Sequence, residues 1–121
     1  MNKASWKKII KTNCESVGTY QPHFDSIIDT LSQILESRDK VHKQWIEEGG
    51  SATVIHVNKA GDANSAKNPL LCLEMDLNSQ ALAYWRDLGL SPAGLRKLKA
   101  DVIIKDEKNG FEKLLASIAD G

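Results

Sequence analysis

The side chains that could carry catalysis or bind a metal are few and lie far apart in the sequence. The histidines are His23, His42 and His56, and neither a His-x-x-x-His nor a Cys-x-x-Cys spacing occurs, so we expect no metal site. The two cysteines, Cys14 and Cys72, are too few for a disulfide framework and have no local signature of a nucleophile. We therefore expect both cysteines to be reduced thiols.

Motifs that bind phosphate or a nucleotide cofactor are also missing. No glycine is followed by lysine, which excludes a Walker A loop, and there is no glycine-rich dinucleotide fingerprint. The carboxylate pairs Glu47-Glu48 and Asp106-Glu107 are adjacent in sequence. On a helix, neighbours point about 100° apart, so neither pair suits general acid–base catalysis. We expect a protein that is not an enzyme and that needs no cofactor.

Length and composition place the chain among small globular proteins. It has 121 residues, and 16 basic and 16 acidic side chains give a formal net charge of zero, which argues against coating nucleic acid by bulk charge. No apolar run approaches the roughly 18 residues of a membrane span, and the N-terminus lacks the apolar core of a secretory signal. We expect a single domain, 1–121, with no membrane partner, in the cytoplasm.

Three prolines mark the places where helices should begin, namely Pro22, Pro69 and Pro92. The sequence predicts a mainly α fold, a long helical hairpin with short flanking helices and a small β-hairpin or loop insert. The predicted elements are a short basic helix at 1–18, a long helix at 22–49, a β-like insert at 51–67, a helix at 69–88, a helix at 92–105 and a C-terminal amphipathic segment at 109–120.

Two of these segments leave alternatives open. The insert has a β-branched strand pattern before a turn signal at 58–62 but a poor return strand, and we favour a compact hairpin over a mobile loop. The segment at 109–120 follows a predicted break at Asn109-Gly110. It either folds back on the core or docks on another protein.

The long helices carry more apolar rows than one short chain can cover. The helix at 22–49 has a stripe with spacing 4 and 3, and the helix at 69–88 has two rows about 100° apart. One row can pack on the long helix, and the second row needs either the short helices or another subunit, from which we predict self-association. The candidate interface residues are Phe24, Ile28, Leu31, Leu35, Trp45, Leu71, Met75, Leu82 and Trp85.

Basic residues gather at two places despite the zero net charge. Four lysines precede the first acid, Glu15, and a second group follows Ser91-Pro92. Either group could contact the phosphates of a nucleic acid, and the alternative for the first is a solvated surface. The candidate DNA-binding residues are Lys3, Lys7, Lys8, Lys11, Arg96, Lys97 and Lys99.

The stretch from Asn68-Pro69 through Leu88-Gly89-Leu90-Ser91-Pro92-Ala93 to Leu98 resembles the phage terminase small subunit. It is similar to the branch with an "NP" helix start followed by "LGLTP" and a basic helix start. The close match covers about 30 residues. The looser plan of an N-terminal Trp helix, a long helix and a β-like insert extends over residues 1–98. Gly94 and Leu95 depart from the Ser-Arg that is usual in this family, so a role of that arginine does not transfer to Leu95.

The resemblance implies a non-catalytic, oligomeric adaptor for genome packaging, with recognition and regulatory roles. The implied partners are double-stranded viral DNA, the large terminase subunit and further copies of the chain in a ring. The implied location is the cytoplasm of the infected or lysogenic bacterial host. Two alternatives remain: a helical protein-interaction adaptor of phage head assembly without DNA binding, and a small helix-turn-helix DNA-binding regulator. Pro92-Ala93-Gly94-Leu95 offers no side chain that reads base edges, which disfavours the second.

Overall fold

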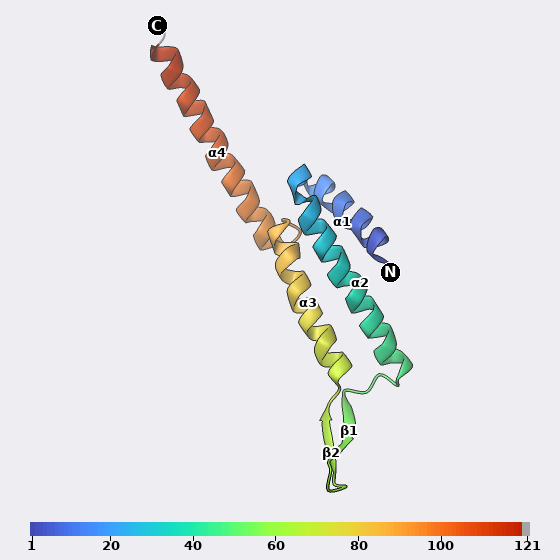
Figure 1. Ribbon diagram of the computed structural model, residues 1–121. Coiled ribbons are helices and arrows are strands. Elements are labelled where there is room, and N and C mark those ends of the chain that lie inside the picture. The colour runs from blue at the N-terminus through green and yellow to red at the C-terminus, as the bar shows by residue number, and fades with distance from the viewer. Residues whose placement is uncertain (120–121) are drawn as a thin grey trace.

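The computed structural model describes residues 1–119 and, within the last helix, the side chains of residues 92–100, 110–112, 114–116 and 118. Two long helices, over residues 25–47 and 69–87, lie side by side and form the body of the molecule (Figure 1). A third helix, over residues 3–17, packs on the helix at 25–47. A β-hairpin extends from one end of the pair, and the last helix runs away from the other end. The elements are α1 (Lys3–Val17), a 3-10 turn η1 (Pro22–Phe24), α2 (Asp25–Glu47), β1 (Thr53–Val57), β2 (Ala63–Lys67), α3 (Pro69–Asp87) and α4 (Pro92–Ala119). The predicted mainly α fold is confirmed.

Side-chain caps explain where the helices begin. Asn2 accepts a hydrogen bond from the Ser5 amide at the start of α1, and Asn68 accepts one from the Leu70 amide at the start of α3. The Ser91 hydroxyl accepts from the Gly94 amide, so α4 starts with the same arrangement of cap and proline as α3. These contacts satisfy amides that the first helical turn leaves without a partner.

The core is small and lies where α1, α2 and α3 meet. Its fully or nearly fully buried side chains are Ile10, Cys14, Ile28, Leu31, Leu35, Ala81 and Leu88. This corrects part of the predicted self-association surface. Ile28, Leu31 and Leu35 are no more than 1% exposed, because the stripe of α2 is used inside the protomer against α1 and α3.

The insert is an antiparallel hairpin, as favoured. Thr53 pairs with Lys67, Ile55 with Ser65 and Val57 with Ala63. The Asn58 carboxamide oxygen accepts hydrogen bonds from the amides of Ala60 and Asp62, which fixes the turn. All ten strand residues are exposed, so the hairpin projects into solvent on both faces.

The C-terminal region differs from the prediction. A single helix, α4, replaces the predicted helix at 92–105 and the separate segment at 109–120, and it continues through Asn109-Gly110; residue 120 lies outside the described residues. Gly110 does not have a positive φ. One glycine costs a helix interior about 1 kcal/mol, which is too little to end a helix that good helix formers continue on both sides.

Gly94 lets α4 begin close to the end of α3. A β-carbon at this position would overlap the backbone carbonyl oxygen of Arg86 and would lie 3.0 Å from the Ser91 hydroxyl. The carbonyl belongs to a helix backbone and cannot move aside as a flexible side chain would. The direction in which α4 leaves the body therefore depends on a glycine here.

We expect Gly94→Ala to lower the free energy of unfolding by about 1–3 kcal/mol, the usual cost of inserting an atom into a filled space. The matched control is Gly110→Ala in the same helix, where nothing lies within 4 Å. That change should stabilise the protein by about 0.5–1 kcal/mol, because alanine favours a helix interior over glycine. Urea denaturation followed by circular dichroism measures both. Equal effects of the two substitutions would contradict the close contact.

Candidate functional site

Three of the four N-terminal lysines make contacts inside the protomer. The Lys3 ammonium lies 3.1 Å from one carboxylate oxygen of Asp29, and the Lys7 ammonium lies 3.2 Å from the other. The Lys11 ammonium lies over the ring of Tyr20, 5.1 Å from its centroid. Lys8 is exposed on α1. The predicted basic group therefore lies partly over acidic side chains of α2.

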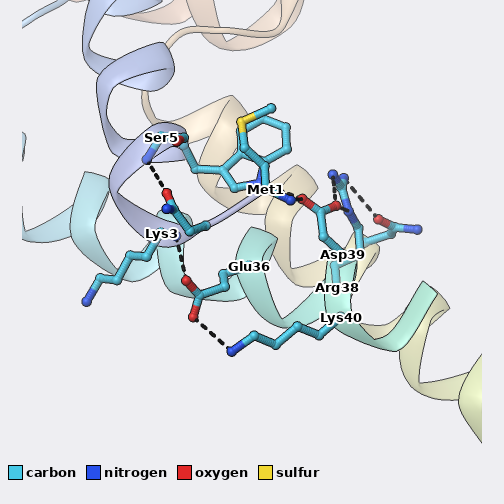
Figure 2. A network of polar contacts seen from close by, with 10 residues as sticks. Met1, Lys3, Ser5, Glu36, Arg38, Asp39 and Lys40 are labelled. Carbon is cyan, nitrogen blue, oxygen red and sulfur yellow. Dashed lines mark hydrogen bonds and ion pairs between the residues drawn. The ribbon is translucent and has the colours of Figure 1, made fainter. Parts of the chain in front are cut away.

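Those acidic side chains hold α1 in place (Figure 2). Glu36 accepts a 2.6 Å hydrogen bond from the backbone amide of Lys3, and Asp39 accepts one of 2.7 Å from the Trp6 indole. Asp39 also contacts the Arg38 guanidinium at 3.0 Å and the N-terminal amine at 3.1 Å. The Arg38 guanidinium lies near the Trp6 ring, 5.4 Å from its centroid. Polar contacts thus extend the interface between α1 and α2 beyond the buried core.

The same contacts shift the carboxyl groups toward their charged forms. Lys3 and then Lys7 lower the pKa of Asp29, and the Lys3 backbone amide lowers the pKa of Glu36. Partial burial raises the pKa of Asp39. The hydrogen bonds from Trp6, Arg38 and the N-terminal amine together outweigh burial, so the pKa of Asp39 is lowered overall. Sequence reasoning missed this acidic row, although Asp29, Glu36 and Asp39 have spacings of 7 and 3 that place them on one helix face.

The second basic group lies at the beginning of α4. Arg96, Lys97 and Lys99 are all exposed. Lys99 lines a cavity together with Val17 and Gln21 at the turn between α1 and α2. Lys11 lies over Tyr20 in the same turn. The structure therefore brings one residue of each predicted basic group to the turn at residues 17–21.

One part of the predicted self-association interface, on the outer face of α3, is not buried inside the protomer. We call Leu71, Met75, Leu82 and Trp85 the outer row. Met75 is 62% exposed and Leu82 is 53% exposed, while Leu71 and Trp85 are half-buried. A hollow beside Leu71 and Met75 reaches the base of the hairpin, and another beside Leu82 and Trp85 reaches the start of α4. The outer row is thus an apolar surface with a recess at each end.

Two other residues of the predicted interface, Phe24 and Trp45, make contacts within the protomer. Phe24 is half-buried and packs against the core. The Trp45 indole donates a 2.8 Å hydrogen bond to the Ser51 carbonyl, and its ring lies 3.9 Å from the position of a β-carbon at Gly50. Trp45 therefore supports the chain that leads into the hairpin.

Histidine and carboxylate side chains do not gather into a metal site in the part of the chain that the structure describes. The contact of His42 Nδ1 with Glu74 Oε1, at 2.8 Å, links α2 to α3. The other carboxylate oxygen of Glu74 is buried without a hydrogen-bond partner. Both cysteines are free thiols, Cys14 buried and Cys72 exposed. Among the described residues, no helix is long and apolar enough to cross a membrane.

Comparison with known proteins identifies the family. Residues 2–102 match the family model described as phage terminase, small subunit. The match runs from the cap of α1 into α4 and includes the hairpin, so it covers most of the chain. The chain belongs to the phage terminase small subunit family, which confirms the resemblance seen in the sequence and supports a role as a packaging adaptor. No curated protein and no solved structure matches the chain.

The pKa directions predict how stability depends on pH. Asp29 and Asp39 have an ordinary pKa of 3.8 and Glu36 one of 4.5, and all three are lowered in the folded protein. The three carboxylates contribute in full to the free energy of unfolding above about pH 5. This contribution shrinks as the pH falls past the ordinary pKa values and is lost below the lowered pKa values.

We expect the thermal midpoint to fall between pH 6 and pH 3, and to fall less in Asp29→Asn combined with Asp39→Asn. Circular dichroism melts at each pH measure this. Asp62→Asn on the exposed hairpin turn is the matched control and should keep the wild-type fall. An unchanged pH dependence in the double variant would contradict the assigned role of Asp29 and Asp39.

Proposed function

We propose that the chain is a non-catalytic, self-associating adaptor that binds double-stranded viral DNA and engages the large terminase subunit during genome packaging. The observation that carries this proposal is the family match over residues 2–102. The location that goes with it is the cytoplasm of the bacterial host. Two surfaces of the protomer, the outer row of α3 and the exposed basic residues, support its separate parts.

Self-association is supported by the outer row of α3. Leucine, methionine and tryptophan on the solvent side of a helix that is already packed on its other side form a surface suited to a second copy. Leu71, Met75 and Leu82 take no part in the core, because Ala81 and Leu88 fill the inner side of α3 and its end, whereas Trp85 packs against the core at its edge. Copies that meet through the outer row would leave the α1–α2 core unchanged, and a ring of such copies is the assembly that we propose.

DNA binding is supported by exposed basic residues of α1 and of the start of α4, of which Lys11 and Lys99 lie at the turn at 17–21. Lys8, Lys11, Arg96, Lys97 and Lys99 lie at the surface, and we assign them the phosphate contacts. Lys3 and Lys7 share Asp29 and therefore have a smaller part. In a ring the same small basic surface repeats around the axis. A neutral protomer then presents many positive charges to one duplex.

One observation favours the alternative function, that of a protein-interaction adaptor that does not bind DNA. The pairing of Lys3 and Lys7 with Asp29 neutralises part of the N-terminal basic group inside the protomer. If the chain has this second function, Lys3 and Lys7 hold α1 against α2, and the partners of the chain are proteins alone. A gel shift of the wild-type chain with long duplex DNA at low salt separates the candidates.

For DNA binding, we expect Arg96→Ala, Lys97→Ala and Lys99→Ala together to weaken affinity. They should also reduce the slope of log K against log salt by about 0.9 for each phosphate that is no longer bound. The matched control is Lys40→Ala with Lys43→Ala, two exposed lysines of α2 with side chains 77% and 80% exposed. The control should keep the wild-type slope. Equal effects in the two variants would mean that binding follows overall charge and not this surface.

For self-association, we expect Met75→Ser with Leu82→Ser to shift the mass in native mass spectrometry toward the 13.4 kDa protomer. Each change makes an exposed apolar side chain polar, while the core and the helix content stay as they are. Ile46→Ser, at a 57% exposed position of α2, is the control and should assemble normally. A wild-type chain that is a monomer at micromolar concentration would refute this part of the proposal.

A further inference from the structure

The outer part of α4 exposes an apolar row that its own protomer leaves uncovered. We call residues 110–118 the arm. Phe111, Leu114, Leu115 and Ile118 are 61%, 57%, 50% and 68% exposed. Together they present roughly 400 Å² of apolar surface, since a large apolar side chain carries on the order of 200 Å². Figure 1 shows that this part of α4 runs away from the other helices.

Helix geometry separates the arm from the side of α4 that contacts the body. Leu98 packs at the root of α4, where a β-carbon at Gly89 would lie 2.7 Å from its methyl carbon and 3.0 Å from that of Thr19. At about 100° per residue, the arm's four apolar side chains point roughly 180° away from the direction of Leu95 and Leu98. The arm also begins about 18 Å beyond Leu98. A continuous α4 therefore cannot turn the arm toward its own core.

A cavity at the root of α4 offers a complementary surface. Its volume is about 350 Å³, and it is lined by Val17, Gly18, Thr19, Phe24 and Leu98, with the exposed Lys99 and Gln21 also contributing. This space accepts one large apolar side chain. The arm also carries a carboxylate, Glu112, next to Phe111, and the rim of the cavity carries the ammonium group of Lys99.

We propose that the arm of one copy docks at the root of α4 in a neighbouring copy, with Phe111 in the cavity between α4 and the turn at 17–21. This inference rests on the proposed self-association and names the surfaces that perform it. A second copy is the occupant that the structure favours, because every copy presents one arm and one cavity. The contact is head-to-tail, the type that gives a ring when the rotation between neighbours closes. The arm alone supplies about half of the roughly 800 Å² per partner of a stable interface.

Cysteine cross-linking between different chains tests the proposal. One chain carries Cys72→Ser and Glu112→Cys, at an exposed position that leaves Phe111 intact, and the other carries Cys72→Ser and Gln21→Cys. Cys14 stays in place in both, because it is fully buried and burial raises the pKa of its thiol. The two chains are co-expressed and mildly oxidised. We expect a disulfide-linked dimer of one chain with the other as the main product on a non-reducing gel.

The matched control replaces Glu112→Cys by Ile55→Cys, at a 79% exposed position of the hairpin, and should give no such dimer. If the wild-type chain assembles but the arm and cavity cysteines do not cross-link, the docking of the arm is wrong while self-association stands. If a chain with both cysteines forms only an internal disulfide, the arm folds back on its own protomer and the proposal is overturned. A monomeric wild-type chain would overturn self-association itself.

Discussion

The packing of α2 between α1 and α3 limits how much apolar surface this protein can bury. Among the described residues, seven side chains make up the buried apolar core, and α2 supplies three of them. A single helix can present one apolar stripe to its neighbours. The stripe of α2 is used completely within the protomer, which leaves the outer row of α3, the hairpin and the arm exposed. Because the burial of apolar area drives association as well as folding, the apolar area that the core does not take up remains available for contacts between molecules.

Much of the fold could be predicted from local signals. The prolines Pro69 and Pro92, each preceded by a capping side chain, mark the starts of α3 and α4 because the cap chemistry involves residues within three positions of one another. The turn of the hairpin follows from Asn58 for the same reason. The continuity of α4 could not be predicted, since Asn109-Gly110 has the composition of a break and only a summed helix preference carries the helix across it.

The candidate site could be predicted only in part, and the reason is distance along the chain. Lys3 and Lys7 look like an unopposed basic group until α2 places Asp29 between them, more than 20 positions later. Ile28 and Leu35 look like interface residues until α1 and α3 cover them. Residue type and spacing predicted an apolar row on α3 outside its contact with α2, because the helix has two apolar rows and the long helix can cover only one of them. The need for glycine at position 94 could not be predicted from the sequence either, since the backbone that a β-carbon there would meet belongs to the end of α3.

The hairpin and the arm lie at opposite ends of the molecule, one beyond the start of α3 and the other at the end of α4 (Figure 1). In a closed ring with cyclic symmetry all subunits point the same way. In such a ring the two ends of each protomer carry different structures, a short β-ribbon at one end and a helix at the other. Such a ring has a front and a back. A partner molecule that approaches such an assembly therefore meets a different surface on each side.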